Sequence, residues 1–208
     1  MCIRDRSNAN RVLTDFLTSG IYDRNRDFIQ TISPSMDILI SSNLERLLYY
    51  ASNKDTQKVA GWMQELNEKG RYQVDEQTFE TIKNLFACAS VDDNGTRQEI
   101  HDVYEKTKYL LDPHSAIAYK VAKDNAGRPV VSLATASPYK FSQDVLKALN
   151  INEENEWVAM DELSKYCQDV IPVQLKELRD LAILHNQVID VDSMKDVVCQ
   201  STQEVFHD

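Results

Sequence analysis

Apolar residues recur at helical spacing along most of the chain. Between Asn10 and Ser19 they fall three or four positions apart, and Gly20 follows where a helix can end. Thr96 and Glu99 have the spacing of a capping box ahead of another apolar stripe. The same periodicity predicts further helices over residues 55–69, 75–89, 96–110, 138–149, 158–167, 173–184 and 191–202, and in the segment DPHSAIAYKVAKD.

Two segments have the character of strands. Met36, Ile38 and Ile40 occupy alternate positions, which indicates a short strand, and Ser41 or Ser42 is placed to cap the helix that follows. Residues 129–135 are apolar and rich in β-branched side chains, and we expect the clearest strand of the chain there. A buried strand needs neighbours, and few other segments qualify. The pattern therefore favours a helix-rich portion of an α/β protein whose remaining strands lie upstream, with a self-contained helical domain as the alternative.

Charge limits the classes of partner. The net charge is −10, and residues 151–208 hold 13 acidic and 4 basic residues. Because binding to phosphate-rich surfaces needs clustered positive charge, we expect neither nucleic acid nor a membrane as partner. The C-terminal part is predicted to be an acidic helical segment.

The cysteines and the N-terminus bear on location. Cys2, Cys88, Cys167 and Cys199 are widely spaced, with no CxxC pair, which predicts reduced thiols, no metal site and a cytoplasmic protein. No apolar run approaches the roughly 20 residues of a membrane span. Residues 1–6, with the sequence MCIRDR, fit neither the following pattern nor a targeting signal. We interpret them as an artefact of sequence assembly and exclude them from the fold prediction.

Three places offer chemistry, each with a plainer alternative. His114 could transfer a proton or only shape the turn into its helix. Ser42 and Asn43 lie at a predicted helix start, where backbone amides favour an anion and the nearby arginine adds charge, but a simple capped helix explains them too. Thr135 follows the predicted strand, where a hydroxyl could face a ligand or cap the next helix.

Four segments, taken in order, resemble signature segments of bacterial and fungal-type threonine synthases: NANRVLTDFLTSGIYD, ISPSMDILISSNLERLL, YLLDPHSAIAY and VSLATASPYKF. The resemblance covers essentially residues 7–208. It implies the C-terminal half of a fold-type II pyridoxal-phosphate enzyme that converts O-phospho-L-homoserine and water to L-threonine and phosphate. It also implies that the missing N-terminal half carries the Schiff-base lysine and the glycine-rich loop for the cofactor phosphate.

The resemblance assigns domains and site residues as expectations. Residues 7–54 and 111–208 would belong to the cofactor-binding α/β domain, and residues 55–110 would form a helical subregion. Thr135 matches the family's hydroxyl contact to the pyridine nitrogen, a neutral partner that moderates the electron sink. Many relatives have His-Pro-Ala-Lys-Phe where this chain has SPYKF, so a histidine role is not transferred to Ser137. The expected substrate-binding residues are Ser42, Asn43, Arg46 and Lys140, and no catalytic residue or metal ligand is expected in this chain.

Two other functions stay open at this point. Residues 55–110 could form the partner-binding surface of a non-enzymatic helical interaction domain. A related pyridoxal-phosphate-dependent dehydratase would keep the cofactor but change the reaction.

Overall fold

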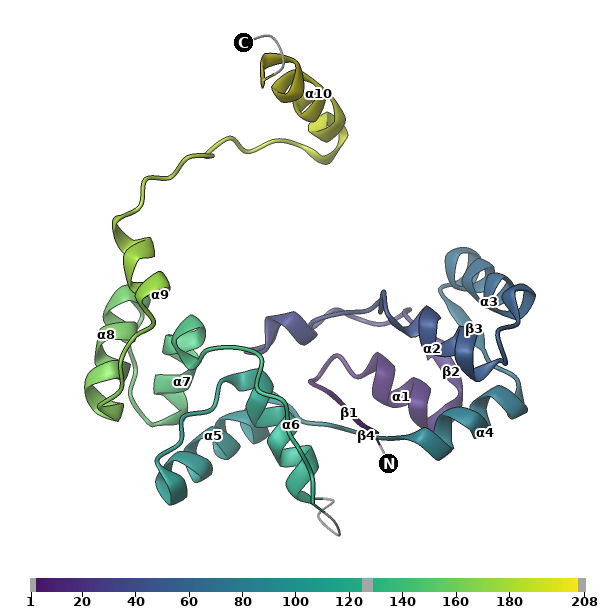
Figure 1. Ribbon diagram of the computed structural model, residues 1–208, viewed down its shortest axis with the longest axis horizontal. Coiled ribbons are helices and arrows are strands. Elements are labelled where there is room, and N and C mark those ends of the chain that lie inside the picture. The colour runs from purple at the N-terminus through teal and green to yellow at the C-terminus, as the bar shows by residue number, and fades with distance from the viewer. Residues whose placement is uncertain (1–2, 125–128, 206–208) are drawn as a thin grey trace.

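The computed structural model describes residues 3–124 and 129–205, and most of them lie in helices (Figure 1). The helices are α1 Val12–Ser19, α2 Leu44–Ala51, α3 Thr56–Lys69, α4 Glu76–Leu85, α5 Asp93–Thr107, α6 Pro113–Asp124, α7 Ser142–Ala148, α8 Glu156–Cys167, α9 Val173–Glu177 and α10 Met194–Val205. Short 3-10 turns are η1 Pro34–Met36, η2 Pro138–Phe141, η3 Leu178–Asp180 and η4 Val191–Ser193. The predicted helix-rich fold is confirmed.

The described residues contain four short strands in two separate pairs. β1 Ile3–Ser7 runs parallel to β4 Phe86–Ser90, and β2 Ile21–Asp23 runs antiparallel to β3 Arg71–Gln73. None of these four lies where the alternation predicted a strand. Residues 75–89, predicted as one helix, are helical only to Leu85, because Phe86 turns into extended backbone and pairs with β1.

The first hydrophobic core gathers side chains from α1 to α4 and from the antiparallel strand pair β2–β3. Phe16, Leu48 and Ile82 are fully buried there. The rings of Tyr22 and Tyr72 stack with centroids 5.3 Å apart. The Phe16 centroid lies 6.0 Å from each of these tyrosine rings. This aromatic group packs the β2–β3 pair against α1.

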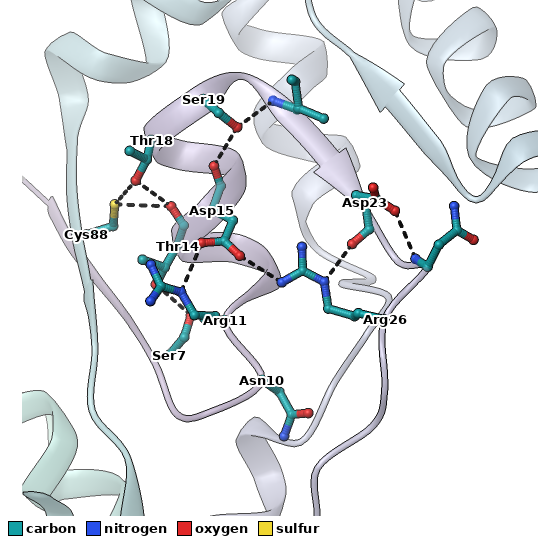
Figure 2. Close-up of polar contacts among 12 residues, drawn as sticks. Ser7, Asn10, Arg11, Thr14, Asp15, Thr18, Ser19, Asp23, Arg26 and Cys88 are labelled. Carbon is teal, nitrogen blue, oxygen red and sulfur yellow. Dashed lines mark hydrogen bonds and ion pairs between the residues drawn. The ribbon is translucent and has the colours of Figure 1, made fainter.

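Ion pairs and hydrogen bonds also connect α1 to the segments around it. Figure 2 shows Asp15 between two arginines, with Arg11 Nε at 2.9 Å and Arg26 Nη1 at 2.7 Å from its carboxylate oxygens. The buried hydroxyl of Thr14 donates to Ser7 Oγ at 2.9 Å. Gly20 ends the helix at φ 75°, in the left-handed region that glycine adopts without strain.

The second core joins α5, α7 and α8, with the fully buried side chains Ile100, Val145, Leu146 and Leu163. α6 packs along α5. Between these two helices Glu99, only 2% exposed, accepts hydrogen bonds from Lys123 Nζ at 2.6 and 2.7 Å. A buried carboxylate needs such a partner, so this pair sets how α6 sits on α5.

The prediction that Thr96 and Glu99 form a capping box at the start of the helix over 96–110 is wrong. α5 begins earlier, because Asp92 is its cap and accepts a hydrogen bond from Gly95 N at 2.8 Å. Thr96 and Glu99 are buried inside the helix, and the Thr96 hydroxyl donates to the Asp92 carbonyl.

The prediction of a strand over Met36, Ile38 and Ile40 is also wrong. Met36 ends η1, and the chain continues without regular structure to α2. The reason is a side-chain network. One carboxylate oxygen of Asp37 accepts hydrogen bonds from Asn8, Asn10 and Thr31 at 2.7 to 2.9 Å, which draws the backbone inward. Neither Ser41 nor Ser42 caps α2, whose N-cap is Asn43.

Residues 129–135, predicted as the clearest strand, form no strand in this chain. The segment is exposed and makes no hydrogen bond to another described residue. A strand exists only through a partner, and no described strand lies beside this segment. The turn signal expected at residues 125–127 falls outside the described residues.

β1 includes four of the six residues that we excluded from the fold prediction. Burial raises the pKa of Asp5, against the opposing charge of Arg6. Asp5 Oδ2 and Arg6 Nε are buried without a hydrogen-bond partner in the described structure. Asp5 and Arg6 therefore place charged side chains beside β4, where burial without a hydrogen-bond partner is unfavourable. The interpretation of residues 1–6 as an artefact stays a prediction.

The C-terminal arm, residues 181–205, leaves the body. Figure 1 shows α10 standing apart at the end of an extended linker. The helix predicted over 173–184 ends early, since α9 stops at Glu177 and η3 at Asp180. The helix predicted over 191–202 is confirmed in η4 and α10.

Packing joins residues across both predicted domain boundaries, since the first core combines residues 12–82 and the second residues 100–163. The division at residues 54 and 110 stays a prediction. Within the two described ranges, none of the helices combines the length and the apolar character needed to cross a membrane.

Candidate functional site

The start of α2 carries three of the predicted site residues. Ser42, Asn43 and Arg46 are all exposed. Asn43 occupies the N-cap position, but its side chain makes no capping hydrogen bond. The first amides of α2 are therefore free of a side-chain acceptor, and they present partial positive charge to solvent.

Tyr22 holds the backbone just before this helix start. Its buried hydroxyl donates to the Leu39 carbonyl at 2.9 Å and accepts from Ser41 N at 2.9 Å. Burial raises the pKa of this phenol, although the bond from Ser41 opposes the shift. This role of Tyr22 cannot be predicted from the sequence, because nothing in the local pattern points to a loop 17 residues further on.

A cavity of about 630 Å³ opens between α2 and α3. Ser42 and Arg46 line it together with the opposing charge of Glu45. Its remaining walls are mostly aromatic or aliphatic, from Tyr49, Tyr50, Thr56, Val59 and Ala60. A cation, a hydroxyl and a free helix N-terminus suit a small anion, while the carboxylate of Glu45 restricts where that anion lies.

The structure places the other two predicted residues elsewhere. Thr135 is exposed at the end of the unpaired segment 129–135, and its hydroxyl makes no hydrogen bond to a described residue. Lys140 is exposed on η2, a turn that Ser137 caps by accepting from Tyr139 N at 3.3 Å. Neither Thr135 nor Lys140 lines the cavity beside α2. The chain thus offers two separate groups of candidate residues.

His114 is a packing residue in this structure. It is 7% exposed, and its Nδ1 lies 3.1 Å from Asp112 Oδ1. Its Nε2 accepts a hydrogen bond from Ser35 N at 3.2 Å. Because Nε2 accepts the hydrogen bond from Ser35 N, Nδ1 is the ring nitrogen that can donate to Asp112. Both ring nitrogens are therefore engaged, and the plainer of the two sequence interpretations fits the geometry.

Asp112 orients both His114 and Ser115 through hydrogen bonds. It caps α6 by accepting from His114 N at 2.9 Å and Ser115 N at 3.3 Å, and it also accepts from the Ser115 hydroxyl. Burial alone would raise the pKa of Asp112, but the hydrogen bonds from His114 and Ser115 outweigh it and hold that pKa below its ordinary value. Ser115 donates to the carboxylate and not to the imidazole, so the three residues do not form a nucleophilic triad.

Comparison with known proteins decides the family. The family model "Threonine synthase, C-terminal" matches residues 115–198. The threonine synthase of Saccharomyces cerevisiae is 37% identical over 196 residues, which cover 84% of this chain and 36% of that protein. A crystal structure of yeast threonine synthase matches 98% of this chain and 42% of its own, with a TM-score of 0.78 and 32% identity.

The chain belongs to the threonine synthase family. A structure of pyridoxal-phosphate-bound threonine synthase from Brucella melitensis, 36% identical, covers 87% of the chain and 36% of its own length with a TM-score of 0.74. The chain thus spans between a third and a half of the length of these threonine synthases. The predicted family and the fold class, a helix-rich part of a fold-type II pyridoxal-phosphate enzyme, are confirmed.

Proposed function

We propose that this chain is the C-terminal portion of a threonine synthase, which converts O-phospho-L-homoserine and water to L-threonine and phosphate with pyridoxal phosphate. The observation that carries the proposal is the match of threonine synthases to 84% and 98% of the chain. The Schiff-base lysine and the loop for the cofactor phosphate belong, in this proposal, to an N-terminal part of the same enzyme. A cytoplasmic location stays a prediction from the cysteine spacing.

Among the residues of this chain, we assign Thr135 to the cofactor site. When bound, pyridoxal phosphate supplies the electron sink for chemistry at the substrate carbons. Thr135 has an exposed hydroxyl with no competing partner among the described residues, at the end of an extended segment. We assign it the hydrogen bond to the pyridine nitrogen. A neutral hydroxyl there leaves that nitrogen largely unprotonated.

We assign the substrate phosphate to the helix start of α2. Ser42, Asn43 and Arg46 provide a hydroxyl, an amide and a guanidinium beside the uncapped amides. Arg46 has no ion pair within the described part of the chain, so its charge is available to a ligand. Lys140 would approach the same phosphate from η2 when the two groups of candidate residues are brought together in the complete enzyme.

Steady-state kinetics of the complete enzyme test this assignment. Replacing Arg46 by alanine removes a charge-assisted hydrogen bond, typically about 1.5–3 kcal/mol, and we expect KM for O-phospho-L-homoserine to rise about 10- to 100-fold. Lys106→Ala is the control, since it also removes an exposed cation but lies on α5. Equal kinetics for the two variants would refute the phosphate assignment.

Phosphate release tests the activity itself. A complete enzyme that forms threonine and phosphate from O-phospho-L-homoserine fits the proposal. Binding of pyridoxal phosphate without phosphate release would favour a related dehydratase, and absence of any cofactor binding would favour a helical interaction domain.

A further inference from the structure

A second cavity, of about 290 Å³, lies beside the start of α2. Residues of α2, α3 and the β2–β3 pair border it, and these elements lie together in Figure 1. Ser42 and Glu45 line both this cavity and the one of about 630 Å³ described above. The two cavities therefore share one wall. The volume of the second cavity is at the lower end of the range for small-molecule sites, which limits its occupant to a few heavy atoms.

Tyr72 presents an unpaired hydroxyl to this second cavity. The residue is only 2% exposed, and its ring stacks on Tyr22 and Trp62 with centroids 5.3 and 6.5 Å apart. The Tyr72 hydroxyl makes no hydrogen bond to another residue of the described ranges, whereas the Tyr22 hydroxyl has two partners. Buried phenol hydroxyls normally have a hydrogen-bond partner, so we expect a ligand in the cavity to supply one.

Glu45 supplies an unpaired negative charge at the same place. It lies in the first turn of α2, and within the described part of the chain its carboxylate makes neither an ion pair nor a hydrogen bond. Its charge reaches the phenol, since burial above all, then Tyr22 and the charge of Glu45, raise the pKa of Tyr72. The Tyr72 hydroxyl therefore stays protonated, and its oxygen can accept a hydrogen bond from a cationic donor.

The rest of the cavity wall is largely aliphatic, from Ile40, Leu44, Met63 and Leu66. A carboxylate and a phenol at one place and aliphatic side chains around them complement a molecule with an ammonium group and a short hydrocarbon body. Glu45 would repel an anionic ligand. A purely apolar ligand would leave the Tyr72 hydroxyl without a partner, which lowers its affinity.

We propose that this second cavity binds a small aliphatic ammonium compound. Its ammonium group donates hydrogen bonds to the Glu45 carboxylate and to the Tyr72 hydroxyl, and its hydrocarbon part lies against Met63 and Leu66. The ammonium site is separate from the proposed phosphate site at the start of α2, and Glu45 stands between the two.

An ammonium group bound there should also affect the phosphate site. Glu45 repels an anion at the start of α2, and an ammonium group paired with Glu45 would offset that charge. Phosphate should then bind about 3- to 10-fold more tightly, and by reciprocity phosphate should tighten the binding of the amine by the same factor. This coupling, unlike the ammonium site itself, rests on the proposed function, which assigns the substrate phosphate to α2.

Isothermal titration calorimetry with n-butylamine tests the ammonium site in the complete enzyme. Borohydride first reduces the bond between the cofactor and its lysine, so that the amine cannot react with the cofactor. We expect saturable binding of n-butylamine and at least about 10-fold weaker binding of n-butanol, which has the same chain but no charge. Equal binding of the amine and the alcohol, or no saturable binding of the amine, would overturn the proposal.

Matched variants locate the bound amine. Glu45→Gln should weaken n-butylamine binding about 10- to 100-fold, and Tyr72→Phe, which keeps the ring, about 5-fold. Glu76→Gln is the control, because Glu76 is an exposed glutamate in the first turn of α4 and lines neither cavity. Equal weakening by Glu45→Gln and Glu76→Gln, or none by Glu45→Gln, would contradict the proposal.

Titration with inorganic phosphate separates the ammonium site from the proposed function. Phosphate should bind more tightly when n-butylamine is present in the parent enzyme, and the amine should make no difference in Glu45→Gln. Amine binding that depends on Glu45 but leaves phosphate affinity unchanged would support the ammonium site and count only against the assignment of the substrate phosphate to α2.

Discussion

Replacing Asp112 by asparagine should separate the role of its charge from its role as a helix cap. Asparagine caps helices about as well as aspartate, and its carbonyl can keep the bonds from His114 N and Ser115 N. Its amide group cannot accept the hydrogen bond that the Ser115 hydroxyl donates to the other carboxylate oxygen. The variant therefore removes the negative charge and one acceptor at a site that is 2% exposed.

The magnitude follows from these contacts. A hydrogen bond to a charged group contributes about 1.5–3 kcal/mol and a neutral one about 1 kcal/mol, so Asp112→Asn should lower the free energy of unfolding by about 1–2 kcal/mol at pH 7. Asp112→Ala also deletes the cap and leaves donors of His114 and Ser115 unpaired, and we expect about 3–5 kcal/mol. Ser115→Ala, which removes a single hydroxyl, should cost about 1 kcal/mol.

Urea unfolding as a function of pH is the assay. The pKa of Asp112 is lower in the folded chain than its ordinary value of 3.8. The stability from its charge is then fully present above about pH 4 and is lost as the pH falls through the folded pKa. The difference between the parent chain and Asp112→Asn should stay constant from pH 7 to pH 5 and shrink below pH 4. A difference under about 0.5 kcal/mol at pH 7, or one that persists unchanged at pH 3, would refute the assignment.

Three further predictions concern the cofactor and the N-terminus. Thr135→Val in the complete enzyme should lower kcat about 5- to 20-fold with little change in cofactor affinity, since one hydrogen bond is lost; unchanged kcat and cofactor absorbance would make Thr135 structural. The chain alone, mixed with pyridoxal phosphate and reduced with borohydride, should show no stoichiometric labelling of one lysine by mass spectrometry, and such labelling would place the cofactor lysine here. Arg6→Val should raise the free energy of unfolding by about 1–2 kcal/mol in urea, because Arg6 Nε is buried without a partner; a decrease would show that the arginine suits β1.

The helices could be predicted from sequence because their signals are local. The stripe from Val12 to Leu17 and the stop at Gly20 lie within one short segment, and the structure has the helix there. The two predicted strands failed because contacts with distant residues decided the outcome. Asp37 binds Asn8, Asn10 and Thr31 in the segment around residues 36–40, and no described strand lies beside residues 129–135. A strand depends on hydrogen bonds to a distant segment, and β4 pairs with residues 3–7, far away in the chain. Alternation alone cannot show whether such a partner is present.

The candidate site also combines features that local sequence determines with features that tertiary contacts determine. Ser42, Asn43 and Arg46 could be placed at one helix start, since a few consecutive residues determine that geometry. The hydrogen bonds between the Tyr22 hydroxyl and the loop before α2 could not be predicted, because they are tertiary contacts between residues far apart in the sequence. The distance between α2 and Thr135 is likewise set by tertiary structure and not by the local sequence.

The parallel pairing of β1 with β4 has a consequence for the order of folding. It closes a loop of about 80 residues between Ser7 and Phe86, and closing such a loop costs conformational entropy before any strand contact offsets it. The first core, from Val12 to Ile82, lies entirely inside that loop and can form beforehand. β1 then adds to a surface that already exists. We therefore expect the folding nucleus to exclude residues 3–7, and substitutions there should change the unfolding rate far more than the folding rate.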